Sequence, residues 1–143
     1  MIKFDGTKWG ILLGATVLLA TVGCGKSVGP TSGVVRFDDG TPVTSGSIEF
    51  RRLSDKARFA SRIDPQGMFQ PTSLDDEVGL PAGAYEVVVV QIVLTEDLAL
   101  EAHTHGNTVP RRYADYYTSD LKVDIAPNQT KRIEIVVPVD AAQ

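Results

Sequence analysis

Short runs of alternating apolar and polar residues follow one another along residues 33–139. In residues 47–52, SIEFRR, an extended chain places Ile48 and Phe50 on one face and the intervening polar side chains on the other. Gly, Pro and Asp separate the runs, and these residues favour turns. No stretch has a helical periodicity long enough to bury a helix. The pattern therefore predicts an all-β chain.

Seven strands are predicted from these runs. Residues 84–94, AYEVVVVQIVL, are apolar on both faces, so this strand belongs in the middle of the protein. Seven short strands at this spacing are typical of an antiparallel β-sandwich with Greek-key connections. The seven predicted strands are residues 33–37, 47–52, 57–63, 68–71, 84–94, 121–125 and 131–139.

Three turn sequences lie between these strands. Glycines at their tight positions are expected to take positive φ, because glycine has no Cβ to oppose that conformation. Tyr85 is expected to place its ring in the core and its hydroxyl at the edge. The residues assigned to these structural turns are Gly40, Pro42, Asp64, Gly67, Pro81, Gly83 and Tyr85.

The order of these turns resembles that of a known family. The sequences VVRFDDGTPVTSGSIEF, DPQGMF and LPAGAYEVVV resemble the carboxypeptidase-regulatory-like domains of bacteria, and VPRRYADYYTSDLKVDI resembles a segment of small bacterial lipoproteins of this type. The resemblance covers residues 32–138. It implies a seven-stranded Greek-key sandwich of the transthyretin (prealbumin) type. It names a scaffold and no reaction, because one fold supports many functions.

The N-terminus has a different pattern. Lys3 and Lys8 precede an apolar run from Trp9 to Val22. As a helix this run reaches roughly 21 Å, short of the ~30 Å hydrocarbon core of a bilayer. A positive start, a short apolar centre and small residues at its end are typical of a secretory signal peptide. Residues 1–23 are therefore predicted to be removed.

The only cysteine of the chain, Cys24, follows this run directly. Thr21, Val22, Gly23 and Cys24 resemble the bacterial lipobox, although Thr21 stands where that motif prefers Leu. The resemblance implies cleavage after Gly23 and attachment of lipid to the Cys24 sulfur. Two or three acyl chains hold a protein on a membrane almost permanently. The alternative is a buried or incidental cysteine.

The predicted organisation has four parts. A signal peptide, residues 1–23, is followed by a flexible tether, residues 24–31, that is rich in Gly, Ser and Pro. The sandwich domain occupies residues 32–138, and a short tail occupies residues 139–143. Of the 14 basic and 18 acidic residues, the signal peptide holds two lysines and one aspartate, which leaves a mature net charge of −5. This charge argues against nucleic acid or anionic lipid as a general partner, because both favour basic surfaces.

The segment 95–110 contains both histidines of the chain, His103 and His105. Together with Glu96, Asp97 and Glu101 they are metal-ligand residue types in one loop. No third strong ligand has a motif spacing, so no metal or other cofactor is predicted, and a polar exposed loop is the favoured interpretation.

Two other groups of charged residues are candidates for binding. The first is acidic, could supply oxygen ligands for calcium, and is interpreted as solvated turns because it lacks the spaced loop of a calcium-binding hand. The second is a basic stripe with an aromatic and basic patch, which could bind sugars or polyanions, but solvated arginines on exposed strand faces are the favoured interpretation because the mature chain is acidic. The acidic group is Asp38, Asp39, Asp75, Asp76 and Glu77, and the second group is Arg36, Arg51, Arg58, Arg62, Arg111, Arg112, Tyr113, Tyr116 and Tyr117.

No nucleophile motif accompanies the serines, histidines and aspartates, so the chain is predicted not to be an enzyme. The hydroxyisourate-hydrolysing branch of the transthyretin-like fold is rejected, because this chain ends PVDAAQ and has its histidines together. The resemblance to lipoproteins implies a bacterial cell-envelope location, on the outer membrane in preference to the inner, facing the periplasm or the exterior. The predicted function is a membrane-anchored binding or assembly module. Alternatives are a carbohydrate- or envelope-polymer-binding module and, third, a metal-dependent hydrolase that uses the His103 and His105 loop.

Overall fold

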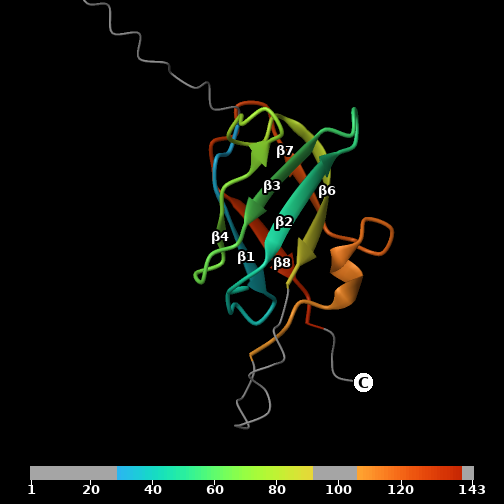
Figure 1. Ribbon diagram of the computed structural model, residues 1–143. Helices are drawn as coiled ribbons and strands as arrows, with labels where there is room; N and C mark the ends of the chain where they lie inside the picture. The colour runs from blue at the N-terminus through green and yellow to red at the C-terminus, as the bar shows by residue number, and fades with distance from the viewer. Residues whose placement is uncertain (1–28, 92–105, 140–143) are drawn as a thin grey trace, which may run out of the picture.

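The structure is a computed structural model, and it describes residues 29–91 and 106–139 (Figure 1). These residues form eight strands and one short 3₁₀-helix, so the all-β prediction is confirmed. The elements are β1 (Gly33–Phe37), β2 (Ser47–Arg52), β3 (Arg58–Arg62), β4 (Met68–Phe69), β5 (Thr72–Ser73), β6 (Gly83–Val90), η2 (Arg111–Ala114), β7 (Lys122–Ile125) and β8 (Ile133–Val137).

The strands lie in two sheets. The smaller sheet has the order β4-β1-β8 and the larger has the order β5-β3-β2-β6-β7. Neighbouring strands pair antiparallel except β1 and β8, which pair parallel with Val35 opposite Ile135. The expectation of a wholly antiparallel sandwich is therefore wrong for this pair. A parallel pair needs a long connection, and here β1 and β8 come from opposite ends of the described chain.

The alternation of apolar residues decides which side chains enter the core. Ile48 and Phe50 of β2 are fully buried, and every second residue of β8, from Ile133 to Val137, is buried as well. Phe50 contacts Phe69 of the smaller sheet with ring centroids 5.5 Å apart, and it contacts Tyr85 of β6 edge-to-face at 6.5 Å. These rings join the two sheets, and among the described residues no polar or charged residue is buried.

The predicted fourth strand, residues 68–71, is shorter than predicted, and a further strand follows it in the other sheet. Met68 and Phe69 form β4 and pair with β1, whereas Thr72 and Ser73 form β5 and pair with β3. Pro71 lies at the crossing point, and proline has no N–H to continue a ladder. The described residues therefore contain eight strands where seven were predicted.

Strand β6 is covered on both faces. It pairs with β2 on one side and β7 on the other, and its outward-facing Val88 is only 6% exposed. The predicted strand was residues 84–94, and residues 92–94 lie outside the described part of the chain. Of the other predicted strands, β1 and β2 have the predicted bounds, and β3, β7 and β8 differ from the prediction by one or two residues at an end.

The sandwich has two ends, which we name by their position relative to the N-terminus. At the proximal end the described chain begins, and Leu80 donates its N–H to the carbonyl of Pro30. The turns 52–57, 73–82 and 126–132 lie at this end, at the top of Figure 1. The turns 38–46 and 63–67 lie at the opposite, distal end. Among the described residues, no helix has the length and apolarity that a membrane crossing requires.

Candidate functional site

A segment between β6 and β7, residues 107–121, lies beside the distal part of β6, and we call it the arm (Figure 1, orange). Near its start the N–H of Val109 donates to the side-chain oxygen of Gln91 at 2.9 Å. Its helix η2 buries Tyr113 completely. Near its end the hydroxyl of Ser119 donates to the carbonyl of Val87 at 2.6 Å. The arm is therefore attached at one end to Gln91, the residue that follows β6, and at the other end to β6 itself.

Tyr116 reaches from the arm to strand β2. Its hydroxyl donates to Oε1 of Glu49 at 2.9 Å, and its ring lies under the guanidinium of Arg51, 4.0 Å from the ring centroid. Arg51 in turn donates to Oε2 of Glu86 at 2.9 Å through Nε and 2.6 Å through the terminal nitrogen. The pairing of β2 with β6 puts Arg51 directly opposite Glu86, so the sheet register itself brings these two charges together.

The electrostatics of this cluster keep each group in one protonation state. Burial raises the pKa of Tyr116, and its hydrogen bond to Glu49 raises that pKa further. The hydrogen bond from Arg51 lowers the pKa of Glu86, and the same bond raises the pKa of Arg51. Arg51, Glu86 and Tyr116 therefore stay in their usual neutral-pH forms, and each has a partner within the cluster. The cluster therefore positions the arm and offers no activated nucleophile or base.

The turn after η2 presents an aromatic side chain to solvent. Tyr117 is 93% exposed, although its N–H donates to Oδ1 of Asp115 at 2.8 Å. The N–H of Ser119 donates to the carbonyl of Asp115, also at 2.8 Å. The backbone of this turn is thus held in place while the ring of Tyr117 remains available for contact.

The structure places the arginines of the predicted basic stripe on two different sheets. It also brings Arg51 of this stripe into contact with Tyr116 of the aromatic patch. Arg36 lies on the smaller sheet and pairs with Glu134 at 3.0 Å, whereas Arg51, Arg58 and Arg62 lie on the larger one. Arg58 pairs with Glu49 at 3.5 Å. The patch is smaller than predicted, because Tyr113 belongs to the core.

The contact between Tyr116 and Arg51 was missed at the sequence level. The outward positions of Glu49, Arg51 and Glu86 in their strands were the available signal, but that signal identifies partners only when the strand order is known. The two remaining arginines of the patch, Arg111 and Arg112, lie in η2, where the Arg112 guanidinium sits 4.6 Å from the Tyr113 ring centroid.

The acidic residues considered as calcium ligands and interpreted as solvated turns lie at opposite ends of the sandwich. Asp39 accepts hydrogen bonds from the hydroxyl and N–H of Thr41, which lower its pKa, and it accepts a further bond from Asn107 at 2.6 Å. Its neighbour Asp38 is in the same distal turn, and the acidic residues 75–77 are exposed in the proximal turn that follows β5. Within the described ranges no three metal-ligand residue types come together.

The predicted turn residues have clear local roles. Asp64 Oδ1 accepts the N–H groups of Gln66 and Met68, and Gly67 takes a φ of +78°. A Cβ at Gly67 would lie 2.5 Å from the carbonyl oxygen of Val35, so the close approach of β1 requires glycine. Gly40 and Gly83 have φ values of +87° and +148°, Pro42 forms an isolated bridge with Arg36, and the fully buried Tyr85 donates its hydroxyl to the carbonyl of Pro81 at 2.7 Å.

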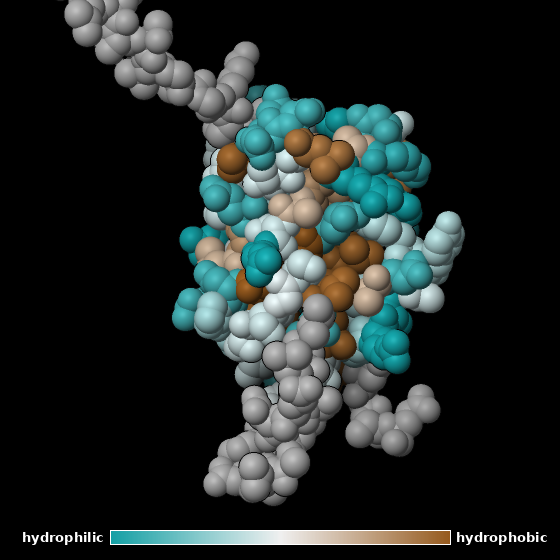
Figure 2. Space-filling view, in the orientation of Figure 1, coloured by the Kyte–Doolittle hydropathy of each residue, from teal (hydrophilic) through white to brown (hydrophobic). Residues whose placement is uncertain are grey.

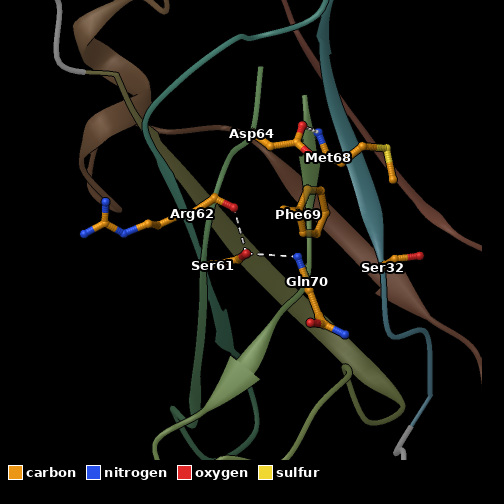
Figure 3. A pocket seen from close by; sticks show the side chains of 7 residues that line it. All are labelled: Ser32, Ser61, Arg62, Asp64, Met68, Phe69 and Gln70. Atoms are coloured by element: carbon orange, nitrogen blue, oxygen red, sulfur yellow. Dashed lines mark hydrogen bonds between the residues drawn. The ribbon is translucent and has the colours of Figure 1, made fainter. Parts of the chain in front are cut away.

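A hollow of about 370 Å³ opens at the seam between the two sheets (Figure 3). Asp64 and Ser61 lie on its rim, and the ring of Phe69 lies between them. The Ser61 hydroxyl already donates to the carbonyl of Arg62 and accepts from the N–H of Gln70, and the Arg62 side chain points away. Phe69 is itself buried. The polar groups of this hollow therefore serve the turn between β3 and β4.

Several predicted site residues lie outside the described part of the chain. These are the lipid-attachment residue Cys24, the histidines His103 and His105, and the acidic residues Glu96, Asp97 and Glu101. The predictions for the lipid anchor and the histidine loop therefore stay predictions. Comparisons with protein-family models, with curated proteins and with solved structures found no match.

Proposed function

We propose that this protein is a membrane-anchored, non-catalytic lipoprotein of the bacterial cell envelope, whose sandwich acts as a binding or assembly module. The observation that carries this proposal is the position of Cys24, the only cysteine, directly after an apolar run too short to span a bilayer. Lipid on that sulfur would fix the chain to a membrane, on the outer membrane in preference to the inner, facing the periplasm or the exterior.

The build of the domain supports this proposal. Its core consists of residues such as Phe37, Ile48 and Val89, and no cysteine is needed to hold the described sheets together. A domain that folds without its cysteine leaves that thiol free for lipid attachment. The tether would thus carry the membrane attachment, and the core would stabilise the fold.

We also propose that the sandwich is of the Greek-key, transthyretin-like type found in carboxypeptidase-regulatory-like domains. The sequence order of the three turn motifs supports this. So do the neighbours β2 and β6, and β1 and β8, which are far apart in sequence but adjacent in the sheets. A fold of this type carries no activity by itself.

The arm is the favoured binding surface of this module, because it holds an exposed aromatic ring on a turn fixed by Asp115. An envelope protein is the proposed partner. A glycan or envelope polymer is the second candidate, favoured by Tyr117, since an exposed ring beside charged groups suits a ligand with both apolar and polar faces.

Substitution of Cys24 tests the anchor. In Cys24→Ser we expect a folded sandwich, seen as an unchanged β-type circular dichroism spectrum, and loss of the protein from the membrane fraction. Mass spectrometry of the wild-type N-terminus should find a chain that begins at a diacylglyceryl-modified Cys24. As a matched variant, Thr21→Leu should raise the processed fraction, because it restores the residue that the lipobox prefers. An unmodified Cys24, or a mature chain that starts elsewhere, contradicts the proposal.

A further inference from the structure

The proximal end of the sandwich carries two of the four large apolar side chains that are exposed among the described residues. Leu74, at the turn after β5, is 90% exposed, and Leu53, at the turn after β2, is 39% exposed. Neither contributes to the core. In Figure 2, apolar surface is visible at this end of the molecule among hydrophilic side chains. Leucines exposed at two turns of the same end are available for contact with a surface outside the domain.

Both leucines lie at the end where the chain from Cys24 enters the domain. The N–H of Leu53 donates to the carbonyl of Ala84 at the start of β6, and Pro30 is bonded to Leu80 just before β6. The five residue steps from Cys24 to Gly29 span at most ~18 Å when fully extended. Strand β6, with eight residues, runs ~26 Å from this end toward the distal end. A lipid on Cys24 therefore keeps the proximal end near the bilayer surface.

The charges of the two ends also favour the proximal end as the one nearer the membrane. The proximal turns balance four basic against four acidic residues, whereas the distal turns and the arm hold two basic and five acidic residues. An anionic lipid surface repels the second group more strongly than the first. The proximal charges are Arg52, Lys56, Lys131, Arg132, Asp55, Asp75, Asp76 and Glu77, and the distal and arm charges are Arg111, Arg112, Asp38, Asp39, Asp64, Asp115 and Asp120.

We infer that the proximal end rests on the lipid surface, with Leu53 and Leu74 in the interfacial region of the bilayer. The arm and the distal turns are then held away from the membrane, where a partner can reach them. This inference rests on the proposed lipid anchor, and it adds an orientation that the anchor alone does not supply. Single leucines at the interface strengthen attachment only slightly, so their effect is on orientation.

A single introduced cysteine tests this orientation. A thiol acylated at Cys24 cannot react, so a new cysteine becomes the only labelling site of the mature chain. We would purify full-length Leu74→Cys and Leu53→Cys from bacterial membranes, label them with bimane, and place them in vesicles of phosphatidylethanolamine and phosphatidylglycerol. Phospholipids that carry a nitroxide on the upper acyl chain then quench any fluorophore that enters the interface. Tyr117→Cys, on the exposed arm, is the matched control.

The expected result is severalfold quenching at positions 74 and 53 and none at position 117. Vesicle-bound protein without quenching at 74 and 53, or with equal quenching at all three positions, overturns the orientation and leaves the anchor intact. The orientation is also overturned if position 74 shows no quenching in vesicles and crosslinks to an envelope protein in bacterial membranes. That result assigns the two turns to a protein partner. Wild-type protein that takes the label at Cys24 and stays in solution overturns the proposed function and the orientation with it.

Discussion

The two faces of the five-stranded sheet use alternate residues of the same strands, yet different forces act on them. On the inner face Phe50 and Tyr85 are fully buried and pack edge-to-face. On the outer face their neighbours Arg51 and Glu86 form an ion pair that Tyr116 covers only in part. Burial of apolar surface is the main stabilising term on the inner face, and hydrogen bonds between half-buried polar groups act on the outer one.

The comparison indicates which face holds the fold together. Ion pairs with exposed partners, such as Arg36 with Glu134, contribute between about 0 and 1 kcal/mol each. A buried phenylalanine contributes several times more. Two tyrosines show the same difference between the faces. The hydroxyl of the buried Tyr85 donates to the carbonyl of Pro81 at the edge of the core, whereas the hydroxyl of Tyr116 attaches the arm to β2. The inner face thus determines stability, and the outer face determines where the arm lies.

The largest expected effect is on the inner face. Phe50→Ala removes the ring that contacts both Phe69 and Tyr85, so it leaves a cavity between the two sheets. We expect the free energy of unfolding to fall by about 3–5 kcal/mol. Urea denaturation followed by circular dichroism measures this change. Leu74→Ala is the control and should stay within about 0.5 kcal/mol of wild type, because Leu74 is almost wholly exposed.

A smaller effect is expected on the outer face. Tyr116→Phe keeps the ring over Arg51 but removes the hydrogen bond to Glu49, so the free energy of unfolding should fall by about 1 kcal/mol. The same change at the neighbouring position, Tyr117→Phe, removes a hydroxyl from an exposed ring and should have no measurable effect. Equal effects at the two positions would show that the contact with Glu49 does not hold the arm.

The pH dependence of the free energy of unfolding provides a second test of the role of Tyr116. Its pKa is raised above the ordinary value of 10.0 in the folded protein, mainly by burial. Above pH 10 the unfolded chain therefore releases this proton while the folded chain keeps it, and stability falls as the pH rises. Tyr116→Phe should lose stability less steeply than wild type above pH 10. Parallel alkaline unfolding curves for the two proteins would contradict the assignment.

The smallest effect is expected at the proximal turn, where an ion pair is exposed. Arg52 donates to both carboxylate oxygens of Asp55, which lowers the pKa of Asp55 from 3.8 to about 2. A lowered pKa gives stability that is present above pH 4 and is lost as the pH falls toward 2. Asp55→Asn should therefore flatten the acid unfolding curve slightly in this range.

Asp75→Asn is the matched control for this prediction. Asp75 lies in a different proximal turn, residues 73–82, and its carboxylate has no hydrogen bond or ion pair in the described structure. Its replacement by Asn changes the net charge by the same amount. An identical change in both variants would indicate that net charge, and not the pair with Arg52, explains the effect.

Much of the secondary structure could be predicted from local patterns. Strands β1 and β2 have the predicted bounds, because SIEFRR alternates cleanly and turn residues stop the run GVVRF. The division of residues 68–73 between two sheets could not be predicted. A two-residue strand has too few positions to show a period, and β4 pairs with β1, which is distant in sequence.

The alternation of core and surface residues, the turn positions and the isolated cysteine can be recognised in the amino-acid sequence, because each depends on neighbours within a few positions. The parallel pairing of β1 with β8 and the contact of Tyr116 with Arg51 cannot be recognised there and are seen only in the folded chain. Which strands become neighbours depends on how two apolar faces pack and on where the connecting segments return. Local alternation specifies which face of a strand is buried, but it carries no information about which strand lies beside it.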